Sequence, residues 1–114
     1  MSNWYSRPVF FVRNVELAIE FYTQKLDFTL AWNHSENGKI LVAQVSRFDL
    51  EIILTLDEEK CGKGRIFISL EEEETEFLKT EIEAKSIDSE EITWGMPVIK
   101  ILDVDGNELF FTTV

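Results

Sequence analysis

The stretch that decides the fold is residues 8–26, PVFFVRNVELAIEFYTQKL. Its first part, residues 8–12, is a short apolar run bounded by a turn signal at Asn14, which is typical of a strand buried on both faces. Asn14 is also a suitable helix N-cap, and the apolar residues after it recur at intervals of three and four. These apolar residues are Val15, Ala18, Ile19, Tyr22 and Leu26. The stretch therefore predicts a buried strand followed directly by an amphipathic helix.

Three further strands are expected after this helix. Residues 28–33, 40–45 and 50–56 are rich in apolar and β-branched side chains, as strands usually are. Turn signals separate them, at Glu36-Asn37-Gly38 and at residues 47–49. The first half of the chain therefore reads strand, helix, strand, strand, strand.

The second half repeats this order after the Gly62-Lys63-Gly64 linker. Its expected elements are a strand at 65–70, a helix through Phe77, Leu78 and Ile82, strands near 91–93, at 97–102 and at 108–113, and a turn at 103–107. At an offset of 56 residues, Glu20-Phe21 falls on Glu76-Phe77. We therefore expect two tandem βαβββ modules, the first at about 5–57 and the second at about 64–114, joined by a linker at about 58–63.

Composition limits the class of protein. With 114 residues, 45% of them hydrophobic and 12% aromatic, the chain suits one compact domain with its own core. The formal net charge of -11 opposes binding to nucleic acid or to an anionic membrane surface, and no apolar run approaches the roughly 20 residues of a membrane helix. One cysteine, Cys61, and no apparent export segment lead us to expect a cytoplasmic protein.

Three motifs accompany the paired modules. They are residues 14–22 (NVELAIEFY), Leu26-Asp27-Phe28 and residues 103–109 (DVDGNEL). Together they resemble the vicinal oxygen chelate superfamily, which holds glyoxalase I, bleomycin resistance proteins and extradiol dioxygenases and often has Leu-Gly-Phe at the second motif. The resemblance covers nearly the whole chain and implies the α+β glyoxalase/bleomycin resistance fold, in which two βαβββ modules form curved mixed sheets. It does not specify the function, because this superfamily carries varied chemistry on one fold.

The resemblance also bears on metal binding. Metal enzymes of this family carry ligands on the first and last strands of each module, and the resemblance puts Arg7, Ile53, Arg65 and Phe110 at these four positions. Arginine stays protonated and the two apolar side chains have no lone pair to donate, so the glyoxalase I ligand set is not retained. The single histidine, His34, also excludes a two-histidine iron site. We therefore expect neither a metal nor another cofactor.

What remains resembles the bleomycin resistance branch, whose members bind their drug as homodimers with the clefts between subunits. The resemblance therefore implies a metal-independent homodimer that binds a small molecule, such as an antibiotic or a metabolite. Aromatic side chains suit planar ligands, and carboxylates would attract a cationic group. The candidate ligand-binding residues are Trp32, His34, Phe48, Glu51, Arg65, Phe67, Trp94 and Met96.

Other interpretations of these residues stay open. Trp94 suits a core or a dimer interface as well as a stacking platform, and His34 suits an exposed turn. In this family the two curved modules form the halves of a cup. Arg7 and Arg65 either hold an anion in this cup or pair with acidic neighbours. The competing function is a lyase-, dioxygenase- or transferase-like enzyme of the same superfamily, with Glu51 as a general base or with a displaced metal site. A third possibility is a dimeric module whose cup is closed and binds nothing.

Overall fold

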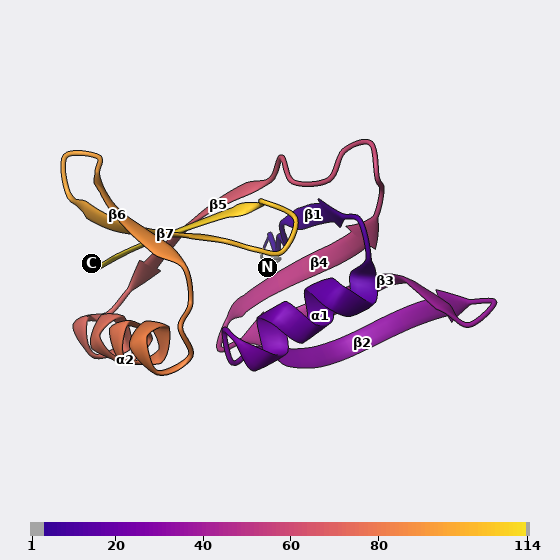
Figure 1. Ribbon diagram of the computed structural model, residues 1–114, viewed down its shortest axis with the longest axis horizontal. Helices are drawn as coiled ribbons and strands as arrows, with labels where there is room; N and C mark the ends of the chain where they lie inside the picture. Colours follow the sequence, from indigo (N-terminus) through magenta and orange to yellow (C-terminus); the bar gives the residue numbers. More distant parts are fainter. Residues whose placement is uncertain (1–3, 114) are drawn as a thin grey trace.

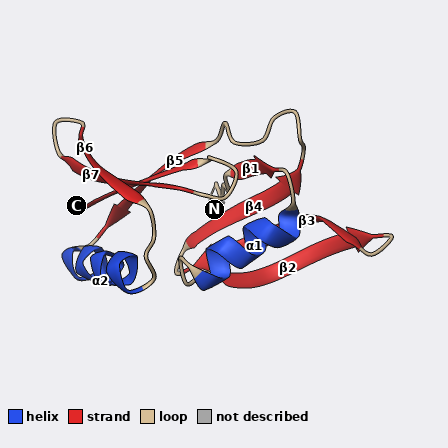
Figure 2. Cartoon of the chain, viewed as in Figure 1, coloured by secondary structure: helices blue, strands red, loops and turns tan. Residues whose placement is uncertain are grey.

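The computed structural model describes residues 4–113 of the chain. The elements follow in the order β1 (Val9–Val12), α1 (Val15–Gln24), β2 (Thr29–Glu36), β3 (Lys39–Arg47), β4 (Leu50–Leu56), β5 (Arg65–Leu70), α2 (Glu72–Ala84), β6 (Ser89–Thr93), β7 (Pro97–Leu102) and β8 (Glu108–Thr113). Strand, helix and three strands thus occur twice, and the predicted pair of βαβββ modules is confirmed (Figures 1 and 2). Residue 114, the expected end of the second module, and the first three residues lie outside the described residues.

Each module forms one mixed four-stranded sheet. The strand orders are β1-β4-β3-β2 in module one and β5-β8-β7-β6 in module two. The first strand of each module pairs in parallel with the last strand, and the other neighbours are antiparallel. The two long hairpins, β2–β3 and β6–β7, lie at opposite ends of the molecule (Figure 1). This arrangement confirms the predicted α+β fold.

The strands of the β2–β3 hairpin are longer than the sequence suggested. They run over residues 29–36 and 39–47, so Glu36, which we assigned to the turn, is the last residue of β2. The turn consists of Asn37 and Gly38 alone, with φ angles of 53° and 77°. Two consecutive residues with positive φ form the tight hairpin turn whose twist matches the adjoining strands, so pairing continues up to the turn. One consequence is that His34 lies within a strand and not in a turn.

The core lies between each sheet and its helix. In α1, Val15, Ala18 and Tyr22 are buried, and the predicted N-cap is confirmed because Asn14 Oδ1 accepts the Leu17 N–H at 3.0 Å. The helix is packed on the face of its sheet that carries Phe10, Val12, Ala43, Val45, Ile52 and Leu54. The core cluster continues into module two through Leu78, Ile87, Ile99, Ile101, Leu109 and Phe111. The two modules therefore share one apolar core.

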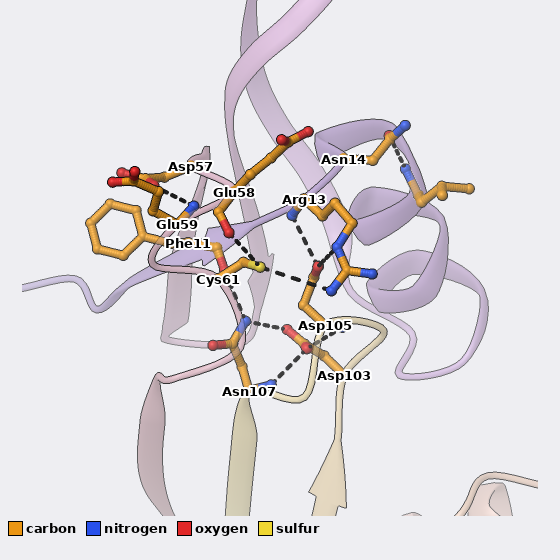
Figure 3. Close-up of polar contacts among 11 residues, drawn as sticks. Phe11, Arg13, Asn14, Asp57, Glu58, Glu59, Cys61, Asp103, Asp105 and Asn107 are labelled. Carbon is orange, nitrogen blue, oxygen red and sulfur yellow. Dashed lines mark hydrogen bonds and ion pairs between the residues drawn. The ribbon is translucent and has the colours of Figure 1, made fainter.

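The turn between β7 and β8 ties module two to module one (Figure 3). Asp103 Oδ2 accepts hydrogen bonds from the Tyr22 hydroxyl and from Asn107 Nδ2, each at 2.9 Å. Asn107 Nδ2 also lies 3.3 Å from the Phe11 carbonyl oxygen, and the Asn107 side-chain oxygen accepts the Gly64 N–H at 2.8 Å. A Cβ atom at Gly64 would lie 2.6 Å from the Phe10 ring, so the chain entering β5 packs directly on β1.

Between residues 4 and 113, no helix has the length and apolar character needed to cross a bilayer.

Two titratable groups in this junction have shifted pKa values. Burial, reinforced by the charge of Asp103, raises the pKa of the Tyr22 hydroxyl well above its usual value, so Tyr22 remains a hydrogen-bond donor. Burial also raises the pKa of the Asp105 carboxyl, although the Arg13 N–H and guanidinium act in the opposite direction. Asp105 Oδ1 accepts the Arg13 N–H at 2.9 Å, whereas Asp105 Oδ2 is buried and has no hydrogen-bond partner among residues 4–113. Deprotonated Asp105 is therefore an unfavourably solvated charge.

Candidate ligand-binding faces

Each sheet has one face packed on its helix and one face turned away from it. On β3, Ala43 and Val45 are buried against α1, so Gln44 between them points to the other side, because successive strand residues alternate. On β8, Leu109 and Phe111 belong to the core by the same rule, so Phe110 points away from α2. We call the two outward surfaces the module-one face (Arg7, Trp32, His34, Gln44, Glu51 and Ile53) and the module-two face (Arg65, Phe67, Trp94, Phe110, Lys100 and Glu108).

Gln44 organises the module-one face. Its side chain lies beneath its neighbours, with only 4% of the residue exposed. Gln44 Oε1 accepts hydrogen bonds from Arg7 Nη1 at 2.8 Å and Trp32 Nε1 at 3.1 Å. Gln44 Nε2 donates to Glu51 Oε2 at 2.9 Å and to Ser46 Oγ at 3.3 Å. This amide therefore fixes a guanidinium, an indole and a carboxylate side by side on one open sheet face.

Gln44 was not among the candidates from the sequence. It stands in the apolar run of β3, where a single glutamine has no recognisable motif. The one available signal was the alternation of side chains along the strand. If Ala43 and Val45 face the helix-side core, the polar residue between them must face away from it. Its partners come from three other segments of the chain, which only the folded structure brings together.

The two arginines differ in their partners. Among residues 4–113, no carboxylate lies within ion-pairing distance of Arg7. Arg65 forms an ion pair with Glu108, and Lys100 Nζ lies 3.6 Å from the second oxygen of the same carboxylate. Of the two interpretations left open by the sequence, pairing with an acidic neighbour is therefore the one realised at Arg65. Arg7 keeps an uncompensated charge on the module-one face.

An aromatic cluster dominates the module-two face. Trp94 stacks on Phe67 with ring centroids 5.9 Å apart and an interplanar angle of 11°, and it covers Phe110 at 4.6 Å. Phe110 is buried beneath it, whereas Phe67 and Trp94 are 46% and 48% exposed. Trp94 belongs to the β6–β7 turn, in which its backbone N–H donates to the Met96 carbonyl at 3.0 Å. The turn thus holds a flat, half-exposed aromatic surface.

The structure separates the eight candidate residues into distinct places. Trp32, His34 and Glu51 lie on the module-one face, and Arg65, Phe67, Trp94 and Met96 lie on or beside the module-two face. His34 is near the tip of the β2–β3 hairpin, exposed, with Nε2 3.2 Å from Glu36 Oε2. Phe48 belongs to neither face: it lies in the β3–β4 turn at the edge of a pocket on the helix side of the sheets.

The side chains at the family's metal positions do not fit a metal centre. Arg7 donates to Gln44, Arg65 pairs with Glu108, and Phe110 is packed beneath Trp94. In the part of the chain that the structure describes, no three His, Cys, Asp or Glu side chains lie close enough together to hold a metal ion. The carboxylates of Glu51 and Glu108, one on each face, are likewise bonded to protein groups.

Known structures share this fold. The chain matches an integron cassette protein from the mobile metagenome of a Halifax Harbour sewage outfall at 20% identity, with a TM-score of 0.78 over 95% of this chain and 96% of that one. It matches lactoylglutathione lyase from Agrobacterium tumefaciens at 15% identity and a TM-score of 0.76, over 98% and 94% of the two chains. It matches TnmS3, an antibiotic binding protein from Streptomyces sp. CB03234, at 16% identity and a TM-score of 0.70, over 99% and 98%.

At these identities the structural matches establish the fold alone. A search of curated proteins gives no match. The sequence model that describes the Glyoxalase/Bleomycin resistance protein/Dioxygenase superfamily matches residues 4–111, which is nearly the whole chain. Together with the paired βαβββ modules, this match shows that the chain belongs to that superfamily.

Proposed function

We propose that this protein binds a small organic molecule against its sheet faces and does so without a metal. The observation that carries the proposal is the aromatic cluster of the module-two face, where Trp94 and Phe67 are stacked yet about half exposed. A rigid, flat aromatic surface outside the core suits a planar ligand, because it offers a large contact area at little cost in side-chain entropy. The antibiotic-binding description of TnmS3 supports a ligand of this kind, an antibiotic or a metabolite.

The module-one face would add polar recognition to this binding. Arg7 offers guanidinium donors that no carboxylate neutralises among the described residues, and Glu51 offers a carboxylate, with Trp32 between the two on the shared Gln44 amide. A ligand with a planar body and polar substituents of both signs would be complementary to the combined surfaces. Such a ligand is distinct from the purely cationic molecule that the net charge of -11 alone would favour.

A homodimer would bring the two faces together. We infer that the module-one face of one subunit lies opposite the module-two face of its partner, with one ligand cleft at each of two equivalent positions. The support for this arrangement is that three large aromatic side chains remain open to solvent on the faces: Trp32, Phe67 and Trp94. A partner would cover part of this apolar area, as dimer interfaces do.

Fluorescence titration tests the binding proposal. The panel holds bleomycin-type glycopeptides, other heteroaromatic antibiotics and anionic metabolites at low and high salt. Replacing Trp94 with alanine should weaken binding by about 2 kcal/mol, because aromatic anchors dominate such interfaces. Trp4→Ala is the matched control, since Trp4 is fully exposed and belongs to neither face. If no member of the panel binds, or if Trp94→Ala binds as tightly as Trp4→Ala, the proposal is wrong.

One observation favours the competing enzymatic function. Glu51 lies on an open face with one carboxylate oxygen held by Gln44, which is the arrangement that a positioned general base requires. In that case a ligand found in the titration would be converted, and Glu51→Gln would abolish turnover. Chromatography of the ligand after prolonged incubation distinguishes the two functions, because a binding protein returns the ligand unchanged.

The cellular location remains an expectation. It rests on Cys61, a single free cysteine without a disulfide partner, which is the usual cysteine content of a reducing compartment. We infer a cytoplasmic protein that meets its ligand inside the cell. Cell fractionation with an antibody against the native chain is the corresponding measurement.

A further inference from the structure

A pocket of about 470 Å³ lies between the two modules, on the helix side of the sheets. Its floor is apolar, and half of it comes from each module: Leu26, Phe28 and Leu50 from module one, Ile68, Leu70 and Phe111 from module two. Ile68 and Phe111 alternate along their strands with Phe67 and Phe110, so this floor is on the opposite side from the aromatic cluster. The volume is within the range of about 300 to 1,000 Å³ that small-molecule sites occupy.

The rim of the pocket carries a net negative charge. Asp49, Glu71 and Glu74 line it, and among residues 4–113 none of the three forms an ion pair. Arg47, the cationic residue that lines the pocket, already interacts with other protein groups. Its Nη2 lies 3.0 Å from Glu81 Oε1, and its Nη1 donates to the Leu26 carbonyl at 2.7 Å. Three carboxylates therefore remain uncompensated around an apolar floor.

Phe48 stands at the mouth of this pocket. It occupies the β3–β4 turn with φ at 53°, a left-handed conformation that phenylalanine rarely adopts, and it is 79% exposed. Its ring lies 6.0 Å from the Arg47 guanidinium, so it is close to the rim without filling the pocket. The ring is thus available for contact with a molecule that enters.

We propose that this inter-module pocket is a second ligand site, separate from the sheet faces, for a small amphipathic organic cation such as an aromatic amine. The apolar body of the ligand packs on the floor, and its ammonium group lies among the rim carboxylates. An anion of the same shape is repelled by the same three carboxylates, because like charges repel each other. A neutral molecule gains only the apolar contact.

Three matched probes test the charge preference: 1-naphthylmethylammonium, 1-naphthylmethanol and 1-naphthoate. They share one ring system and differ in charge. We expect calorimetry to detect one ammonium ion bound per chain and to find tighter binding of the ammonium than of the alcohol, and we expect the carboxylate not to enter the pocket. The amide NMR signals of Leu50, Ile68 and Leu70 should shift on binding, whereas those of Trp32 and Trp94 should not.

Two variants of one helix provide the matched control. Glu74→Gln removes a rim carboxylate and should weaken binding of the ammonium about threefold. Glu73→Gln makes the same charge change at the neighbouring position of α2, which does not line the pocket, and should have little effect. Phe48→Asn, a residue that tolerates positive φ, should also weaken binding. Trp94→Ala should leave it unchanged, so this result does not depend on the proposed function.

Four outcomes would each overturn the inference. They are absence of ammonium binding, equal binding of the alcohol or the carboxylate, equal effects of Glu74→Gln and Glu73→Gln, and NMR shifts confined to the sheet faces. Equal effects of Glu74→Gln and Glu73→Gln would mean that the general acidity of the chain attracts the probe. Shifts confined to the faces would mean that the ammonium uses the site of the proposed function instead.

Discussion

At the scale of single residues, the module-one face depends on Gln44. A buried amide is stable only when its hydrogen-bonding groups have partners, and here Arg7, Trp32, Glu51 and Ser46 supply them. The orientation of the amide follows from its partners, because only its oxygen can face two donors and only its nitrogen can face a carboxylate. The sequence placed Trp32 and Glu51 among the site residues, but their connection through Gln44 depends on contacts between distant segments.

Replacing Gln44 with leucine tests this dependence. The variant removes the acceptor of Arg7 and Trp32 and the donor to Glu51, so the free energy of unfolding should fall by about 1–3 kcal/mol. Ser46→Ala removes only the longest of the four hydrogen bonds and should cost less than about 1 kcal/mol. Urea unfolding of both variants gives the comparison. Equal stability of Gln44→Leu and the wild type would show that this network contributes nothing.

Asp105 predicts a measurable pH dependence. Because burial raises its pKa in the folded chain, the folded chain binds the proton at a higher pH than the unfolded chain does. The unfavourable contribution of the charged form is therefore complete at neutral pH and is relieved as the pH falls through the folded-state pKa. The wild type should gain stability relative to Asp105→Asn between pH 7 and about pH 4. A stability difference that is constant over this range would contradict the raised pKa.

At the scale of the elements, local sequence signals predicted the bounds of those strands that depend on a single segment of the chain. The bounds of β5, β7 and β8 agree with the predicted 65–70, 97–102 and 108–113. The β2–β3 hairpin was longer than predicted, because strand length there depends on pairing between segments. The sequence also could not predict that Phe48 lies at the pocket on the helix side of the sheets, because this position depends on the left-handed conformation of a two-residue turn.

The two helices provide an internal comparison of N-caps. Asn14 caps α1 through its side chain, whereas Glu71 at the start of α2 makes no side-chain cap bond. Asn14→Ala should therefore lower the free energy of unfolding by about 1 kcal/mol, and Glu71→Ala should change it by less than about 0.5 kcal/mol. Thermal and urea unfolding of the two variants measure the difference. Equal losses would mean that the Asn14 cap is not an important source of stability.

At the scale of the whole molecule, the modules are held together on two sides. The turn containing Asp103 bonds to Tyr22, and on the helix side Arg47 pairs with Glu81 while Lys25 Nζ donates to the Lys85 carbonyl at 2.8 Å. The shared apolar core lies between these contacts. The repeat in the sequence predicted two modules, but it could not predict these contacts, because the residues that meet are not at equivalent positions of the two halves.

From these contacts we predict that residues 4–113 unfold as one cooperative domain. Urea unfolding at one fixed protein concentration should give a single transition with coincident fluorescence and circular dichroism curves. Tyr22→Phe should lower the free energy of unfolding by about 1–3 kcal/mol, because it removes the buried hydroxyl bonded to Asp103. It should leave the transition single. Two separate transitions in the wild type would show that the modules are independent domains.

The most direct test of the account asks whether each ligand cleft is built from two subunits. Trp32→Ala and Trp94→Ala subunits, each weak in binding alone, are unfolded together and refolded as a mixture. If the clefts lie between subunits, a mixed dimer has one cleft with both substitutions and one cleft with neither. Random mixing should then restore about a quarter of the clefts to wild-type affinity in the fluorescence titration. A mixture that binds no better than either variant alone would contradict the proposed cleft between subunits.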